Sequence, residues 1–178
     1  VFGDNVITHQ RLENVGAISK EDAISYGMSG SNGRASQWAN DLRKNYPYAA
    51  YDKIDWDQVV LDNCDAQDRY YLRIKEIEQS IRIIEQLIDN IPEGEYYIKQ
   101  KPIIKVPEGQ SYFACEGTSG GCGVQLAFKG DKAPYSMKIS PMAVTLVAAL
   151  DEVLRGTKVA DLIAVGAGLD YIIPDIDR

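Results

Sequence analysis

One long amphipathic segment, about Ala66 to Asn90, constrains the fold of this chain more than any other feature. Its apolar residues recur in alternating steps of four and three, which places them in one stripe along a helix. The stripe consists of Tyr70, Ile74, Ile77, Ile81, Ile84, Ile88 and Ile91. Leu72, Ile83 and Leu87 widen the face that we expect to be buried. Pro92 ends the helix, because proline cannot continue the hydrogen-bond ladder.

Shorter elements are expected before the long helix. Ser19 is placed to cap the N-terminus of a short helix that stops at Gly27. The other expectations for this half are a loop at residues 30–33, a second short helix at 36–45 and a strand at 58–61.

In the second half of the chain the pattern changes from helical to alternating. Short apolar or alternating runs at residues 111–115, 124–128 and 135–139 are separated by glycine-containing turns, which predicts an antiparallel hairpin or meander. Residues 141–154 predict a helix. Residues 159–165 form either a strand or a buried helix, since periodicity alone does not separate the two. Helices followed by strands are typical of the α+β class.

The charge balance and the cysteines exclude several protein classes. The chain has 19 Lys and Arg against 26 Asp and Glu, and the net charge of -7 offers no electrostatic footprint for nucleic acid or anionic lipid. No window reaches the roughly 18–20 apolar residues of a membrane span, and no export signal is visible. The cysteines Cys64, Cys115 and Cys122 suit a reducing compartment better than a disulfide framework.

Two glycine-rich stretches resemble nucleotide-binding loops but lack their context. Residues 117–123 lead into a strand pattern and not into a helix N-terminus, which favours a hairpin turn over a phosphate loop. The pair Gly166 and Gly168 lacks the third glycine of a dinucleotide fingerprint. With His9 as its only histidine, the chain does not supply the close ligand pairs of a zinc or iron–sulfur site. We therefore predict no metal site and no catalytic set.

A dense basic-aromatic cluster closes the second short helix. Its chemistry-bearing side chains are Asp41, Arg43, Lys44, Tyr46 and Tyr48. Two interpretations stay open: a helix C-terminus with its usual cations, or a recognition or buried ion-pair cluster.

Several motifs, taken in order, resemble one known family. The stretch ISKEDAISYGMSG is followed by GRAS, DLRKNYPYAAY, RIKEIEQSIRIIEQLIDNIPEG, IKVPEG, DKAPYSMKI, GTKVADLIAV and the terminal PDIDR. This order is similar to the D subunit of respiratory complex I, which belongs to the quinone module of that NADH:quinone oxidoreductase. The D subunit is itself a relative of the large subunit of nickel–iron hydrogenases. The resemblance runs from about Val6 to Arg178 and is loosest at residues 52–65.

The resemblance implies a hydrogenase large-subunit-like fold and a chain that is the C-terminal portion of a larger subunit. A start at Val1 without an initiator Met fits that expectation. Residues 1–92 would form a helical part, and residues 93–178 would contain the hairpin, a C-terminal helix and the tail. The His and Tyr that bind the quinone headgroup in this family would lie in the N-terminal half, and the long helix would pack against helices of that half.

The resemblance also gives a role to the apolar tail LDYIIPDIDR. In the hydrogenases the equivalent stretch carries a C-x-x-C that binds nickel and iron, and Tyr171 and Pro174 stand near those places here. The implied role is instead to line the quinone chamber, beside an iron–sulfur cluster of a neighbouring subunit. The expected lining residues are Asp170, Tyr171, Ile172, Ile173, Asp177 and Arg178. A charged tail end needs an opposite charge, and Arg34 and Arg43 are the candidate partners of Asp177.

The chain departs from the family at a few positions. Ser119 and Ser136 stand where many members have Arg, and a histidine-bearing helix between the long helix and the hairpin is missing. Our interpretation is a quinone-module part of an NADH dehydrogenase that shapes the quinone chamber and couples electron transport to ion translocation. The alternatives are a component of a membrane-bound, hydrogenase-related complex without a nickel–iron site, or a non-redox assembly subunit.

The resemblance sets expectations for cofactors, partners and location as well. We expect no cofactor on this chain itself, with quinone and NADH used by the parent complex and iron–sulfur clusters held by neighbouring subunits. The expected partners are the iron–sulfur subunit of the quinone module and a membrane-arm subunit. The expected position is peripheral, at the cytoplasmic face of the membrane.

Overall fold

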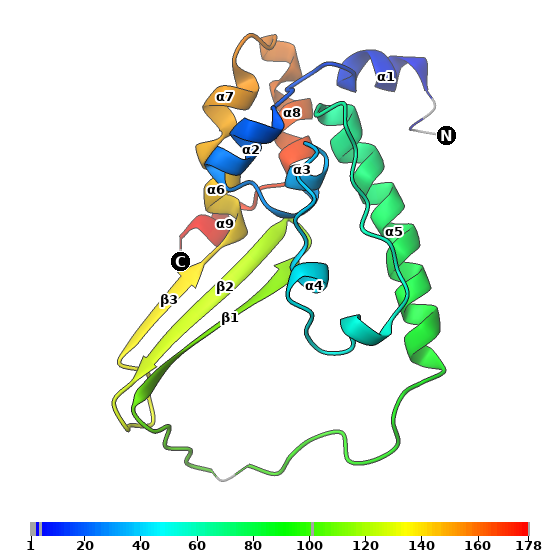
Figure 1. Cartoon of the computed structure of the whole chain (residues 1–178). Helices are drawn as coiled ribbons and strands as arrows, with labels where there is room; N and C mark the ends of the chain where they lie inside the picture. Colours follow the sequence, from blue (N-terminus) through cyan, green and yellow to red (C-terminus); the bar gives the residue numbers. More distant parts are fainter. Residues whose placement is uncertain (1–2, 4, 101, 178) are drawn as a thin grey trace.

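The computed structural model describes residues 3, 5–100 and 102–177, and its fold is mixed α+β (Figure 1), as the order of the patterns predicted. The elements in chain order are α1 (Val6–Leu12), α2 (Lys20–Tyr26), α3 (Gly30–Arg34), α4 (Leu42–Asn45), a 3-10 turn (Tyr51–Lys53), α5 (Ala66–Ile88), β1 (Gly109–Gly117), β2 (Gly120–Phe128), β3 (Ser136–Ser140), α6 (Met142–Ala148), α7 (Leu150–Leu154), a second 3-10 turn (Val159–Asp161), α8 (Leu162–Leu169) and α9 (Ile173–Ile176).

Helix α5 is the long helix predicted from the stripe. Asp65 caps its N-terminus, because the Asp65 carboxylate accepts a hydrogen bond from the Asp68 amide at 2.9 Å. The helix buries Leu72 and Ile83, which lie about half a turn away from the isoleucine stripe. The five isoleucines of the stripe within α5 are on the surface, with exposed fractions between 43% at Ile74 and 64% at Ile88, whereas Tyr70 is half-buried. The face of α5 that carries Leu72 and Ile83 therefore packs into the core of this chain, and the isoleucines of the stripe are not covered by the described residues. Within the described residues, no helix is long and apolar enough to cross a bilayer.

We expect the chain to self-associate through the uncovered stripe of α5. Each buried isoleucine is worth roughly 1.5–3 kcal/mol, so mutual burial of several drives association. Sedimentation should show a dimer or larger species, and the double variant Ile77→Lys/Ile84→Lys should shift it to monomer. Ile163→Lys, at an exposed isoleucine on α8, is the matched control and should leave the association unchanged. A monomeric unsubstituted chain would contradict the prediction.

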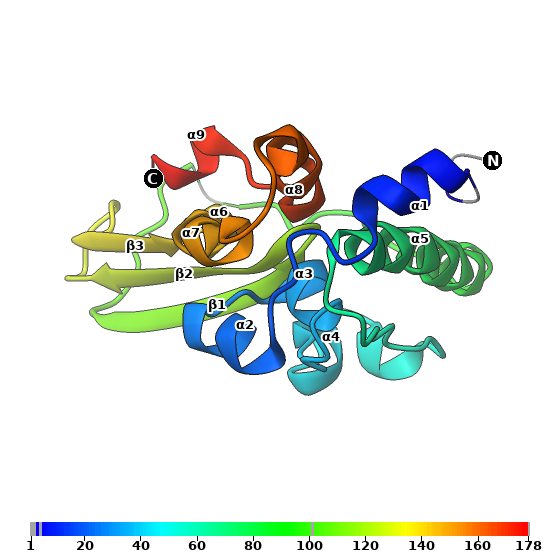
Figure 2. The same ribbon diagram turned by 90° about the horizontal axis from the view of Figure 1, so that it is seen from above.

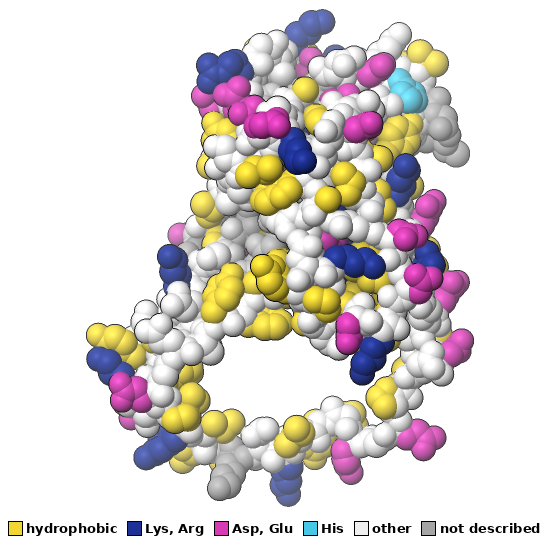
Figure 3. Space-filling view, in the orientation of Figure 1, with side chains coloured by type: hydrophobic (Ala, Val, Ile, Leu, Met, Phe, Trp, Pro, Cys, Tyr) yellow, Lys and Arg dark blue, Asp and Glu magenta, His cyan; other side chains and the backbone are white. Residues whose placement is uncertain are grey.

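The three strands form an antiparallel meander in the order β1-β2-β3, which confirms the expected hairpin and meander. The register places Gly117 opposite Gly120 and leaves a two-residue turn, Thr118-Ser119. The helices gather at this turn, and the other end of the sheet extends away from them (Figure 1). Apolar side chains lie on the surface over the sheet (Figure 3). Phe113 of β1 and Met137 of β3 are each 59% exposed.

The main hydrophobic core joins elements that are distant in sequence. It contains Ile18, Ala23, Met28, Leu146, Ala149, Val153, Val165 and Leu169. Seen from above, α6 to α9 lie to one side of the sheet and α2 to α4 to the other (Figure 2). The α2 region and the α6–α8 region meet at the turn end of the sheet, so the core fixes where α8 and the tail begin.

Two expectations for the first half are wrong. Residues 30–33 are not a loop but belong to the short buried helix α3, where Gly30 allows the backbone to approach the β1–β2 turn. Of residues 36–45, only Leu42–Asn45 are helical, because Asp41 caps that helix by accepting a hydrogen bond from the Arg43 amide at 2.9 Å.

Residues 58–61 are not a strand either. Their neighbourhood is held by bonds outside any sheet: Leu61 pairs with the backbone of Arg34 and Gln37, and the Asp57 amide donates to the side chain of Gln79. Residues 159–165 resolve the open alternative in favour of a helix, as the second 3-10 turn and the start of α8.

Candidate functional site

A buried ion-pair cluster joins α3, α4, α5 and β1 around Arg34, whose side chain is only 1% exposed. The Arg34 guanidinium lies 3.3 Å from Asp41 at the start of α4 and 2.7 Å from Glu116 on β1. Arg34 Nε also donates to Glu76 of α5 at 3.0 Å. Three carboxylates from three elements thus converge on one buried cation. Such a set is strongly bound only when every charge keeps its partners.

Arg43 adds a second cation to this cluster. It donates to both oxygens of Asp41, at 2.9 and 2.6 Å. Burial alone would raise the pKa of Asp41, but the hydrogen bonds from Arg43 and the charge of Arg34 outweigh it and hold that pKa below its ordinary value. The Arg43 guanidinium also lies over the ring of Trp56, with 4.6 Å to the centroid.

The other members of the basic-aromatic cluster lie around this centre. Lys44 donates to the Trp56 carbonyl at 2.6 Å, and its ammonium lies 4.2 Å from the centroid of that ring. The Tyr48 hydroxyl accepts a hydrogen bond from the Glu116 amide at 3.0 Å. Tyr46, by contrast, is 75% exposed. Of the two open interpretations, these contacts favour a buried ion-pair cluster.

Asp177 does not pair with Arg34 or Arg43, and that expectation is wrong. Both arginines are already held by Asp41 and its neighbouring carboxylates, while Asp177 is exposed. The acid that ties the end of the chain is instead Asp175, which accepts a hydrogen bond from the Ala143 amide at 3.1 Å. Arg178 lies outside the described residues.

The apolar part of the tail is only partly covered. Tyr171 packs against the hydrophobic core, but Ile172 and Ile173 are 54% and 62% exposed. These exposed side chains follow Asp170, the residue at which α8 ends in the left-handed conformation with φ 56°. The tail therefore presents an apolar surface next to a carboxylate.

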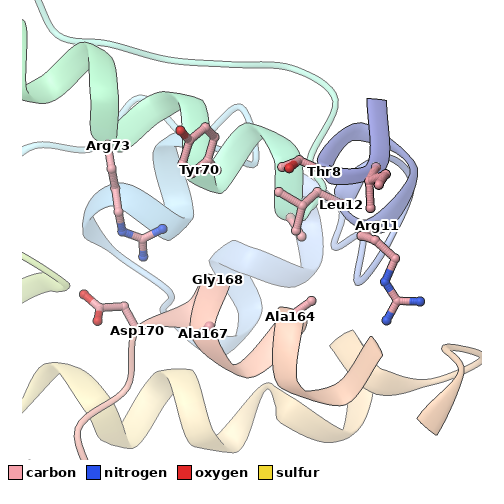
Figure 4. A pocket seen from close by; sticks show the side chains of 11 residues that line it. Thr8, Arg11, Leu12, Tyr70, Arg73, Ala164, Ala167, Gly168 and Asp170 are labelled. Carbon is pink, nitrogen blue, oxygen red and sulfur yellow. The ribbon is translucent and has the colours of Figure 1, made fainter. Parts of the chain in front are cut away.

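The β1–β2 turn fixes the position of Asp170. The Ser119 hydroxyl lies 3.1 Å from both the backbone oxygen and a carboxylate oxygen of Asp170, to which it donates. Ser119 is 5% exposed, so this contact is sheltered from water. Asp170 and Arg73 face each other across a cavity of about 560 Å³ (Figure 4). The cavity is lined mainly by apolar side chains of α1, α5 and α8, including Ile7, Leu12, Ala66, Ala164 and Ala167.

Arg73 of α5 lines the cavity, and Arg69 lies one helical turn before it. Burial lowers the pKa of Arg69 to about 10, and its Nη2 donates to the Gly16 carbonyl at 2.7 Å. Burial also lowers the pKa of Arg73, an effect that the charge of Asp170 partly offsets. Within the described part of the chain, Nε and Nη1 of Arg69 and Nη2 of Arg73 are buried without an acceptor. An unsatisfied buried donor costs about 1–3 kcal/mol, so an acceptor in the cavity that reaches Nη2 of Arg73 would be bound favourably.

Sequence reasoning missed these arginines, together with Glu76 and Glu116. Arg69, Arg73 and Glu76 follow one another at steps of four and three, a spacing equally typical of a solvated helix face. The only signal was that this charged row lies next to the isoleucine stripe. Among the described side chains, no group of three or more His, Cys, Asp or Glu residues is placed to hold a metal ion.

One known protein family matches the whole of this chain. The model of the family described as respiratory-chain NADH dehydrogenase, 49 Kd subunit, matches residues 1–106 and 100–178. The chain belongs to this family. The predicted relationship to the D subunit of complex I is thereby confirmed.

Curated relatives agree with membership of the 49 Kd subunit family. The chain is 53% identical over all of its 178 residues to the C/D subunit of NADH-quinone oxidoreductase from Bacteroides thetaiotaomicron, and covers 34% of that protein. It is 54% identical to the C/D subunit from Bacteroides fragilis, again over 34% of the relative. Over 98% of this chain it is 40% identical to the D subunit from Desulfotalea psychrophila, and covers 47% of it. The chain thus spans about a third to a half of the length of these relatives.

Proposed function

We propose that this chain works within an NADH:quinone oxidoreductase, where Asp170 to Ile173, with Asp177 and Arg178, line part of the quinone chamber. Membership of the 49 Kd subunit family supports the general role. The observation that carries the finer proposal is the apolar cavity lined by Asp170 and Arg73, where Nη2 of Arg73 is buried without an acceptor among the described residues. Of the proposed chamber residues, Asp170 is the one that lines this cavity, and the role of the tail residues after it rests on the family. The names of the relatives favour this role over a hydrogenase-related or a purely structural one.

The chemistry of a quinone fits these surroundings. A quinone presents ring carbonyl oxygens and an apolar body, and a site of this type combines apolar walls with a few placed donors. Reduction builds negative charge on the carbonyl oxygens, so a guanidinium donor stabilises the reduced forms more than the oxidised one. In this proposal Arg73 supplies the donor, and Asp170 orients the guanidinium from across the cavity.

The rest of the redox chemistry belongs to other parts of the complex. This chain would shape the chamber and would contact the iron–sulfur subunit of the quinone module and a membrane-arm subunit. NADH oxidation and the iron–sulfur clusters would reside in neighbouring subunits, and the coupling to ion translocation would run through the shape of the chamber. The hydrogenase large-subunit-like fold and the peripheral position at the cytoplasmic face of the membrane are part of the same proposal.

Arg73→Gln is expected to impair quinone reduction in the assembled complex. Loss of a charge-assisted hydrogen bond of about 1.5–3 kcal/mol corresponds to a fall of roughly 10- to 150-fold in the rate. The measurement is NADH:quinone reductase activity of the purified complex, compared with NADH:ferricyanide activity, which does not need the quinone chamber.

Arg155→Gln is the matched control, because Arg155 is exposed and, among the described residues, its side chain pairs with Asp151 and Glu152 of the preceding helical turn. It should leave both activities unchanged. A normal quinone rate in Arg73→Gln would remove Arg73 from the chamber. A loss of complex yield with normal specific activity would assign the arginine to structure alone.

A further inference from the structure

Two of the three cysteines face each other across the hairpin. The register pairs Cys115 of β1 directly with Cys122 of β2. Residues that are paired in an antiparallel ladder project their side chains from the same face of the sheet. Both side chains are half-buried, and the structure carries both as thiols. Six residues lie between them along the chain, and these include the tight turn.

The hydrogen-bond pattern gives the spacing of this pair. The Glu116 amide donates to Tyr48 and so points away from β2. Hydrogen-bonded and non-hydrogen-bonded pairs alternate along an antiparallel ladder, which makes Cys115–Cys122 a hydrogen-bonded pair. In such pairs the Cα atoms are about 5.5 Å apart. Disulfides join Cα atoms over roughly 4.4–6.8 Å, with the commonest value near this one. The Cα separation of such a pair lies within the range of disulfides. The Cβ atoms, about 5.5 Å apart in a hydrogen-bonded pair, must approach to about 4.5 Å or less, and the strain of that approach makes the bond easier to reduce.

We propose that Cys115 and Cys122 are an oxidisable thiol pair that forms a reversible intramolecular disulfide when the chain meets hydrogen peroxide or an alkyl hydroperoxide. One thiolate attacks the peroxide oxygen, the O–O bond breaks, and a sulfenic acid forms as water or an alcohol leaves. The second thiol attacks that sulfur, the S–S bond forms, and the sulfenic oxygen departs as water. The two sulfurs together lose two electrons, and the peroxide gains them. A dithiol reductant reverses the step by thiol–disulfide exchange.

The third cysteine has a different environment. Cys64 lies in the segment before α5, in the left-handed conformation with φ 64°. Burial raises the pKa of the Cys64 thiol, and the neighbouring carboxylates Asp68, Asp62 and Asp65 raise it further. A raised pKa leaves less of the reactive thiolate at neutral pH. Cys64 therefore serves as an internal reference for thiols that should stay reduced.

The disulfide would enclose contacts that hold the candidate site together. Between the two cysteines lie Glu116, which binds Arg34, and Ser119, which binds Asp170. Closing the ring limits how far residues 116–121 can open away from α3 and the tail. Oxidation of this pair would thus hold Ser119, and through it Asp170, more firmly in place. The lining of the cavity would not have to change.

The test uses the unsubstituted full chain, reduced, freed of reductant and treated with equimolar hydrogen peroxide. Alkylation with N-ethylmaleimide and intact mass should show the loss of two of three reactive thiols, and peptide mapping should link Cys115 to Cys122. Dithiothreitol should restore three alkylated thiols. Amide exchange at residues 116–121 should be slower in the oxidised chain than in the reduced one.

Two variants sharpen the result. Cys64→Ser should still form the intramolecular disulfide, whereas Cys115→Ser should abolish it and leave Cys122 alkylated or trapped as sulfenic acid by dimedone. Three alkylated thiols after peroxide treatment, or a link from either cysteine to Cys64 or to another chain, would overturn the proposal. Because mapping is done on the unsubstituted chain, the outcome stands even if Cys115→Ser does not fold.

Discussion

Arg34→Ala is expected to lower the free energy of unfolding by about 3–5 kcal/mol. The substitution removes the cation that Asp41, Glu76 and Glu116 share, and leaves these carboxylates close together and largely out of water. Only Arg43 would remain to neutralise them, and it lies next to Asp41. The measurement is urea unfolding followed by tryptophan fluorescence, since Trp56 packs against the same cluster.

Arg82→Ala is the matched control for this prediction. Arg82 also pairs with two carboxylates, Asp55 and Asp57, but its side chain is 41% exposed and its partners are more exposed still. Ion pairs in such a setting contribute about 0–1 kcal/mol. If both arginine variants lose similar stability, burial is not what makes the Arg34 cluster strong, and our account of the junction between α3, α4, α5 and β1 fails.

Gly30→Ala is expected to cost about 2–5 kcal/mol of stability. Gly30 has φ +71°, where a side chain adds roughly 1–2 kcal/mol of strain. A Cβ atom at this position would also come within 2.3 Å of the Cα atom of Gly120, and backbone cannot yield as a flexible side chain can. The backbone shifts that make room for this Cβ atom lower the stability by a further 1–3 kcal/mol, approximately. Thermal unfolding should show a clear drop, together with weaker amide protection at the β1–β2 turn.

Gly109→Ala provides the comparison within the same sheet. Nothing lies within 4 Å of a Cβ atom built at Gly109, at the far end of β1. We expect a change of at most about 0.5 kcal/mol, as for other open surface positions. Equal effects of the two substitutions would show that the close approach of α3 to the turn does not limit stability.

The elements predicted well from the sequence are those whose hydrophobic pattern is long or regular. Helix α5 keeps one stripe over its whole length, and the three strands alternate between glycine turns, so local periodicity was sufficient. The same periodicity could not tell which flank of α5 this chain would bury. Leu72 and Ile83 are in the core, while the isoleucines of the stripe and Leu87 remain at the surface.

What could not be predicted depends on contacts between distant segments. Composition marked residues 30–33 as a loop, but packing against the β1–β2 turn stabilises them as a helix. Arg34 was predicted to pair with the tail, but it pairs instead with Glu76 and Glu116, which lie 42 and 82 residues further along the chain. Arg69 and Arg73 had no local feature that distinguishes a buried arginine from an exposed one. Burial of a charge is decided by tertiary structure.

The composition of the hydrophobic core has a consequence for biosynthesis. Its first members, Ile18, Ala23 and Met28, are translated long before Leu146 and Leu169, with which they pack. While the chain emerges from the ribosome, the early segment lacks its native packing partners. Its apolar side chains stay exposed and can bind other apolar surfaces. Long-range closure of this kind also slows folding. The nascent chain should therefore be a substrate for chaperones until its last few helices have been released.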